Sequence, residues 1–280
     1  MISAGIGKTL NNLDRVDINV NYRGPAFVPA GVWQPAYLIQ LGSSDVYVRN
    51  SLVDIYRKGQ IPLLSPDQSQ PWVMNTSLDT VGSIATDAKL TFELFDLKNR
   101  IVLSGPLSNI ARSNNVITGS TIIPAESVEL WWPVGYGSQT LYTLRVNMTS
   151  SKDSNMAASA IKKVGFRTIL LNQEPIRPDQ LAKGIAPGSN WHFEINGKEF
   201  YAKGSNLIPP DTFWTRVTRE KMRMLFHAVK KGNQNMLRVW SSGAYLPDFM
   251  YDLADGESIN LVRSNLNRTN GNRDGNSTVV

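Results

Sequence analysis

A single arginine in an apolar segment is the first candidate for chemistry. The segment QNMLRVWSSGAY, residues 234–245, places Arg238 among hydrophobic residues that are typical of a short strand. Because a strand alternates its side chains between two faces, Leu237 and Val239 are expected on one face. Arg238 and Trp240 then share the opposite face. A guanidinium stays protonated and matches a carboxylate with two hydrogen bonds, so Arg238 is expected to hold either a functional carboxylate or a structural acid.

Further candidates lie in the segment that precedes this strand. In GSNLIPPD, residues 204–211, the side chains of Asn206 and Asp211 follow a predicted strand and are in position to contact a ligand. The competing interpretation is that both residues cap the loop and the next helix, which Asx residues do commonly. The indole of Trp240 offers an apolar platform, although an isolated tryptophan is usually part of a core.

Composition excludes several classes of function. The chain has 280 residues and a formal charge of +6, from 29 basic and 23 acidic residues that are scattered along it. Nucleic-acid binding usually needs clustered Lys and Arg, so no such partner is expected. The absence of cysteine excludes disulfides and thiolate metal sites. We expect no cofactor and no metal. We also expect no membrane span, since no apolar run approaches about 18 residues.

Signals of secretion are mixed. The first residues, MISAGIGKTLNNLDRVD, contain no long apolar stretch and do not read as a signal peptide. Asn-x-Ser/Thr sequons nevertheless favour a secreted chain and predict N-glycosylation at four positions. These positions are Asn75, Asn147, Asn267 and Asn276.

The chain changes its pattern near residue 173. Before that point, short alternating segments separated by turns predict an antiparallel β-sandwich, with strand-like sequence beginning near residue 32. After it, Asn196-Gly197 predicts a hairpin turn, and Thr218 predicts the start of a helix that ends near Gly232. A strand and a second helix follow, which is the order of a parallel α/β architecture.

Five segments, taken in order, carry a likeness to a known family. They are GPAFVPAGVWQPAYLIQL, ELWWPVGYGSQTLYTLRV, VGFRTILL, INGKEFYAKGSNLIPPDTFW and GNQNMLRVWSSGAYLPDFMYDLAD. From about residue 24 to 255 the chain resembles the β-mannosidases of glycoside hydrolase family 2 type, above all the secreted fungal enzymes. The resemblance implies a multi-domain fold: the end of a jelly-roll domain over 1–44, an all-β immunoglobulin-like sandwich over 45–172, and the first βα units of a (β/α)8 TIM barrel over 173–255. Residues 256–280 depart from the family, and their Asn-rich sequence without apolar periodicity predicts a disordered tail.

The resemblance implies hydrolysis of terminal, non-reducing β-D-mannose residues by a retaining mechanism with two glutamates. In the family the acid/base glutamate follows an asparagine, and no Asn-Glu pair occurs in this chain. Neither catalytic glutamate can be assigned, so the chain by itself is expected to be inactive. Before its Gly-Pro the family usually has Trp-Asp-Trp, where this sequence has Asn21, Tyr22 and Arg23.

The same resemblance implies a supporting role for Arg238, which would hold the active-site carboxylate, while Trp240, Asn206 and Asp211 are candidate contacts to the substrate. It implies an extracellular protein whose partners are β-mannoside oligosaccharides or N-glycan-derived mannosides, and a possible homodimer. Two other functions stay open. One is a non-catalytic carbohydrate-binding or protein-interaction module built on the sandwich, and the other is a small active hydrolase with unrecognised carboxylates.

Overall fold

The computed structural model describes residues 36–41, 46–150, 156–211, 216–239, 246–257 and 259–263. These residues fall into two compact units. The β unit contains the described residues of Ile39–Trp132 and Gly137–Tyr201. The βα unit contains Pro133–Tyr136 and the described residues from Ala202 onward, together with residues 36–38. Among the described residues, no helix has the length and apolar character that a membrane crossing requires.

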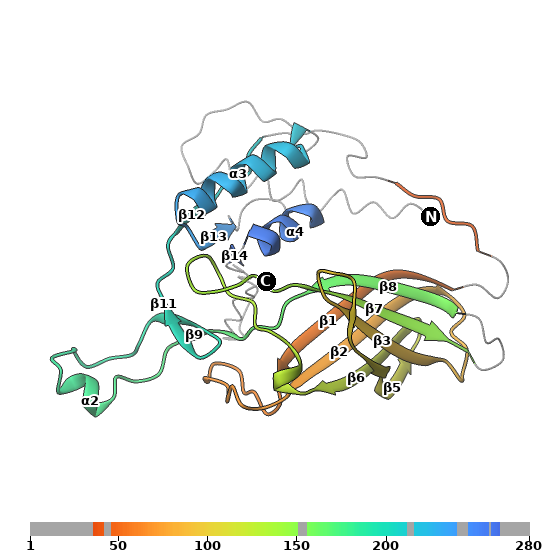
Figure 1. Cartoon of the computed structure of the whole chain (residues 1–280), viewed down its shortest axis with the longest axis horizontal. Helices are drawn as coiled ribbons and strands as arrows, with labels where there is room; N and C mark the ends of the chain where they lie inside the picture. The colour runs from red at the N-terminus through yellow and green to blue at the C-terminus, as the bar shows by residue number, and fades with distance from the viewer. Residues whose placement is uncertain are drawn as a thin grey trace, which may run out of the picture. The chain divides into compact units, whose positions relative to one another are not determined.

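Two four-stranded antiparallel sheets form the body of the β unit (Figure 1). The first sheet has the order β1 (Val46–Arg57), β2 (Trp72–Gly82), β6 (Val116–Ile123) and β5 (Ser108–Ser113). The second has the order β4 (Ile101–Pro106), β3 (Lys89–Phe95), β7 (Tyr142–Thr149) and β8 (Met156–Val164). A short 3-10 helix, η1 (Ala125–Ser127), follows β6.

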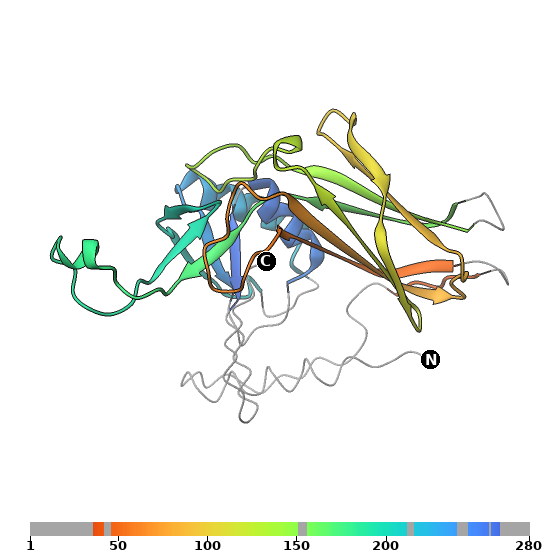
Figure 2. The same ribbon diagram turned by 90° about the horizontal axis from the view of Figure 1, so that it is seen from below.

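Strict alternation along the central strands explains why the two sheets stack. In β2 every second residue from Trp72 to Thr80 is buried, and in β7 the same holds from Tyr142 to Met148. The buried faces of both sheets contribute to one hydrophobic core, and Figure 2 shows the two sheets from a second direction. An aligned pair of sheets with a shared core is a sandwich, so the predicted antiparallel β-sandwich is confirmed.

A third antiparallel sheet extends the β unit. It contains β9 (Ile169–Asn172), β10 (His192–Ile195) and β11 (Lys198–Phe200), in the order β11–β10–β9, with the short helix α2 (Pro178–Leu181) between β9 and β10. The predicted hairpin turn is confirmed, because Asn196 and Gly197 have φ angles of 50° and 74°, as a two-residue hairpin of this type requires. The domain boundary expected at residue 172 falls within this sheet.

Glu194 fastens this third sheet to the loop between β1 and β2. One carboxylate oxygen accepts a hydrogen bond from the Ser65 hydroxyl at 2.6 Å, and the other accepts one from the Asn172 amide at 2.6 Å. His192 Nε2 lies 3.2 Å from Glu194 and 3.4 Å from Glu199. Burial acts to raise the pKa of Glu194, but the hydrogen bonds from Ser65, Asn172 and His192 outweigh it and hold the pKa below the usual value.

Replacing Glu194 with glutamine is expected to destabilise the β unit by about 1–2 kcal/mol at pH 7, because charge-assisted hydrogen bonds are lost. A carboxyl with a depressed folded-state pKa stabilises the fold above its ordinary pKa of about 4.3, and this contribution disappears as pH falls through the folded-state value. The difference in Tm between wild type and Glu194→Gln should therefore be present at pH 7 and close to zero near pH 2. A difference that is equal at both pH values would contradict this explanation.

The βα unit contains the predicted parallel sheet. Its strands are β12 (Gly204–Leu207), β13 (Met236–Val239) and β14 (Asn260–Arg263), connected through helices α3 (Arg219–Lys231) and α4 (Asp248–Glu257). The predicted N-cap of α3 is confirmed, since the Thr218 hydroxyl accepts from the backbone N–H of Lys221, and the helix ends at Gly232. Residues of both helices pack with one face of the three strands in a single core.

Two expectations about the ends of the described chain are wrong. A disordered tail was expected from residue 256, yet α4 runs to Glu257 and β14 pairs with β13 in parallel. The buried residues Ile259 and Leu261 belong to a run too short to show periodicity in the sequence. Strand-like sequence was expected from residue 32, yet residues 36–41 form no strand, and none of the described strands pairs with them.

The remaining parts of these expectations cannot be compared with the structure. The jelly-roll segment 1–44 lies almost entirely outside the described residues, as do residues 264–280 of the tail. Within the sandwich, the segment SVELWWP, residues 127–133, was expected to be a strand, but it begins at the last residue of η1 and forms only isolated bridges from Leu130 and Trp131. Strand β5 was not expected, because its sequence SNIARS lacks clear alternation.

Candidate functional site

Arg238 and Asn206 come together on neighbouring parallel strands. Asn206 of β12 lies opposite Arg238 of β13 in the strand register, and Nη1 of Arg238 donates a hydrogen bond to Oδ1 of Asn206 at 3.3 Å. Leu237 and Val239 are buried in the core that also contains α3 and α4, whereas Arg238 is exposed. The predicted alternation is therefore confirmed for these three residues, and the guanidinium lies on the face opposite the helices.

This arrangement gives Arg238 a defined orientation. The amide oxygen of Asn206 occupies one donor of the guanidinium, and an arginine has five donors in a rigid fork. Both residues stand near the carboxyl ends of parallel strands, where barrel enzymes position their functional side chains. Chemically, the pair can orient a carboxylate or bind an oxygen-rich ligand, but neither side chain can supply a proton at neutral pH.

The close approach of β12 to β13 depends on Gly204, which is not among the predicted site residues. Gly204 lies opposite Met236 in the register, and a β-carbon at position 204 would overlap the carbonyl oxygen of Met236. A glycine inside a strand often marks a site where another backbone approaches closely. That signal was present in the sequence GSNL, at the first residue of the strand.

Replacing Gly204 with alanine is expected to force β12 away from β13 at a cost of about 1–3 kcal/mol. The amides of residues 204–207 and 236–239 should then exchange with deuterium faster than in wild type. Gly256→Ala is the matched control, because nothing lies within 4 Å of a β-carbon placed at this helical position. Equal exchange rates in Gly204→Ala and Gly256→Ala would contradict the proposed close packing.

Asp211 forms an ion pair with Arg216, a residue of the same loop. One carboxylate oxygen of Asp211 accepts hydrogen bonds from Nε and Nη2 of Arg216, at 3.0 and 2.6 Å. The carboxylate is largely buried and the arginine is mostly exposed. This ion pair within one loop favours the structural interpretation of Asp211 over direct contact with a ligand.

Several predicted site residues lie outside the described part of the chain. Trp240 lies outside the described residues, and so do Asn21, Tyr22 and Arg23. Among the predicted glycosylation sites, Asn75 lies on β2 and Asn147 on β7, whereas Asn267 and Asn276 lie outside the described residues. In the described part of the chain, no group of His, Asp and Glu side chains could hold a metal ion.

Comparison with known proteins gives the class to which this fold belongs. Residues 64–167, which cover most of the sandwich, match the family described as Glycosyl hydrolases family 2. The solved β-D-mannosidase of Dictyoglomus thermophilum is 25% identical and superimposes with a TM-score of 0.60, over 80% of this chain and 25% of that chain. A β-glucuronidase of Bifidobacterium dentium shares the fold at 18% identity, with a TM-score of 0.56 over 79% of this chain and 31% of that chain.

The curated relatives are closer still. The chain is 56% identical over 240 residues to β-mannosidase A of Aspergillus niger and 55% identical to that of Aspergillus aculeatus. Each alignment covers 85% of this chain and 26% of the relative. The chain is therefore a homologue of β-mannosidase A with a segment of glycosyl hydrolase family 2, and it spans about a quarter of the length of these relatives.

Proposed function

We propose that this chain is a portion of a retaining β-mannosidase that acts outside the cell on terminal β-D-mannose residues. In this proposal, β12 and β13 are the first strands of a (β/α)8 barrel. The observation that carries the proposal is the contact between Arg238 and Asn206, on strands whose other face packs against helices. The identity of 56% to a β-mannosidase A supports the choice of substrate.

Each described site residue has a defined task in this proposal. Retaining hydrolysis requires two carboxyl groups about 5–5.5 Å apart. Neither of the two catalytic glutamates is assigned to a residue of this chain. Arg238 orients one of these carboxylates through its planar fork, and Asn206 fixes the rotamer of Arg238. Asp211 holds the loop through Arg216, and Trp240, which lies outside the described residues, remains a proposed contact to the sugar. Mannoside oligosaccharides are the proposed substrates, and a homodimer remains a proposal.

A chimeric enzyme tests the role of Arg238. In β-mannosidase A of Aspergillus niger, the aligned segment is replaced by the matching 240 residues of this chain, and hydrolysis of an aryl β-D-mannoside is measured. Arg238→Ala is expected to lower kcat/KM by about 100-fold, the scale of loss that a misplaced catalytic group produces. Arg238→Lys should recover little of this, because an ammonium cannot form the bidentate contact.

The matched control for this experiment is Arg223→Ala. Arg223 is an exposed arginine on α3, so its removal should leave kcat/KM nearly unchanged. An inactive chimera containing the unmodified segment would count against the proposed function. Equal activity of the Arg238→Ala and Arg223→Ala chimeras would contradict the role given to Arg238.

A further inference from the structure

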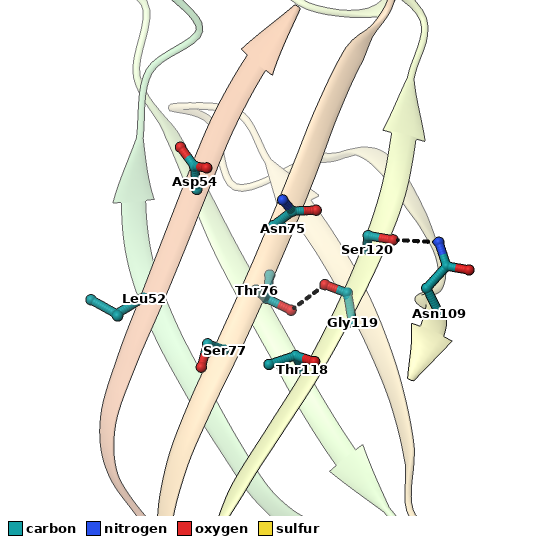
Figure 3. A pocket seen from close by; sticks show the side chains of 9 residues that line it. All are labelled: Leu52, Asp54, Asn75, Thr76, Ser77, Asn109, Thr118, Gly119 and Ser120. Atoms are coloured by element: carbon teal, nitrogen blue, oxygen red, sulfur yellow. Dashed lines mark hydrogen bonds between the residues drawn. The ribbon is translucent and has the colours of Figure 1, made fainter. Parts of the chain in front are cut away.

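A pocket of about 440 Å³, lined mainly by residues with polar side chains, lies on the outer face of the sheet β1–β2–β6–β5 (Figure 3). Its volume falls in the range of about 300–1,000 Å³ that is usual for small-ligand sites. Residues of four strands, β1, β2, β6 and β5, contribute to it. The lining residues are Leu52, Asp54, Asn75, Thr76, Ser77, Asn109, Thr118, Gly119 and Ser120.

The chemistry of the lining suits a neutral ligand with many hydroxyl groups. In one row Asp54 lies opposite Asn75, and Asn75 lies opposite Ser120. The amide of Asn109 donates to the Ser120 hydroxyl at 2.9 Å, as the dashed line in Figure 3 shows. Carboxylate, amide and hydroxyl groups together both donate and accept hydrogen bonds, and neither lysine nor arginine lines the pocket. The lining therefore suits a sugar better than an anion.

An independent feature of the sequence lies in the same pocket. Asn75, Thr76 and Ser77 form an Asn-x-Ser sequon. Because side chains alternate along β2, Thr76 is buried in the core while Asn75 and Ser77 face the pocket. Nδ2 of Asn75 donates to the Tyr56 hydroxyl at 3.2 Å, and this nitrogen carries a second hydrogen that a sugar can replace.

The other described sequon is built differently. Nδ2 of Asn147 donates to Glu93 at 3.4 Å, and Glu93 also forms an ion pair with Arg145 at 3.3 Å. Oδ1 of Asn147 is buried and has no hydrogen-bond partner in the described part of the chain. A glycan at Asn147 would have to fit beside this charged pair, whereas at Asn75 a pocket is already open.

We propose that Asn75 carries an N-linked glycan whose first N-acetylglucosamine residue lies in this pocket. The oligosaccharide comes from a lipid diphosphate-linked donor. The bond between the anomeric carbon and the diphosphate oxygen breaks, a bond from that carbon to Nδ2 forms, the amide loses one proton, and the lipid diphosphate leaves. Asp54 then accepts a hydrogen bond from the sugar, and the remaining N–H of Asn75 continues to donate to Tyr56. This inference rests on the extracellular location in the proposed function, but it does not depend on hydrolysis.

The test uses residues 1–280 produced in yeast behind a cleavable secretion signal, and the same chain produced in bacteria. Peptide mapping of the intracellular and secreted yeast protein together should find a glycan at Asn75. Ser77→Ala should abolish it and Ser77→Thr should retain it. Thr149→Ala, which removes the sequon of Asn147, should leave the glycan at Asn75 unchanged.

Binding of the first sugar in the pocket has its own measurement. After an endoglycosidase has trimmed the glycan to one N-acetylglucosamine, the yeast protein should have a Tm about 3 °C above that of the bacterial protein, as expected for a small gain in stability. Asp54→Ala should keep the glycan and lose this gain. Asp79→Ala is the matched control, since Asp79 is on β2 outside the pocket lining, and it should keep the gain.

Two results would overturn the inference. One is an unmodified Asn75 in the yeast protein, whatever the state of Asn147. The other is that the trimmed yeast protein and the bacterial protein have the same Tm, or that Asp54→Ala and Asp79→Ala change the Tm difference between them by the same amount. Neither readout involves turnover of a mannoside, so a failure here is distinguishable from failure of the proposed enzymatic function.

Discussion

Purified residues 1–280 are expected to show no measurable hydrolysis of an aryl β-D-mannoside. Acid/base and nucleophilic groups act as a unit, and loss of one alone can cost about 10⁶-fold in rate. Arg238 and Asn206 cannot replace either group, because a guanidinium stays protonated at neutral pH and an asparagine side chain has no carboxyl group to act as an acid or base. Neither of the two glutamates that the proposed retaining mechanism requires can be assigned to this polypeptide, since it contains no Asn-Glu pair. Fluorimetric release of the aryl leaving group provides the measurement.

The chimera that contains the aligned 240 residues is the positive control, because it supplies the remaining residues of a β-mannosidase A. The comparison is made at equal protein concentration and with circular dichroism spectra that show a folded β unit in both samples. Turnover by the purified 280 residues that Asp211→Asn abolishes would contradict the expectation. It would mean that Asp211 and a second carboxyl of this chain form an active pair.

Replacing Phe166 with alanine is expected to destabilise the β unit by about 3–5 kcal/mol, the range for a fully buried phenylalanine. Phe166 has no exposed surface. Its ring meets Trp72 at 5.5 Å and Tyr142 at 5.6 Å between centroids, both edge to face. Because domains are stable by only about 5–15 kcal/mol, this single cavity should remove a large part of the stability. Urea unfolding followed by tryptophan fluorescence gives the free energy of unfolding.

Two variants give this measurement its controls. Phe166→Leu keeps most of the apolar volume and should cost clearly less than Phe166→Ala. Leu97→Ala changes a residue that is 80% exposed, so the expected change is within about 0.5 kcal/mol. If Phe166→Ala and Leu97→Ala have the same free energy of unfolding, the edge-to-face aromatic cluster is not the centre of the core.

Local patterns in the sequence predicted local structure well. The short alternating segments predicted an antiparallel sandwich, and β2 and β7 do bury every second residue, because a strand with one buried face must alternate. Thr218 predicted the start of α3, since its hydroxyl satisfies an N–H that the helix leaves free. Asn196-Gly197 predicted the hairpin between β10 and β11, because both positions need a positive φ.

Predictions failed where structure depends on a distant partner. The run of residues 259–263 is too short to show a period, and it becomes a strand only because β13 offers a parallel edge. Residues 36–41 have apolar side chains but no paired neighbour among the described strands. The third sheet also depends on distant contacts, since Ser65 reaches Glu194 across 129 positions of the chain.

The sequence by itself determined the likeness to β-mannosidases, the face of β13 on which Arg238 lies, and the presence of a sequon at Asn75. These follow from residue identity and from the fixed period of a strand. Only the tertiary structure decided that Asn206 contacts Arg238, that Asp211 pairs with Arg216, and that Asn75 lies in a pocket. Contacts between strands depend on register, and register is set by the packing of the whole sheet.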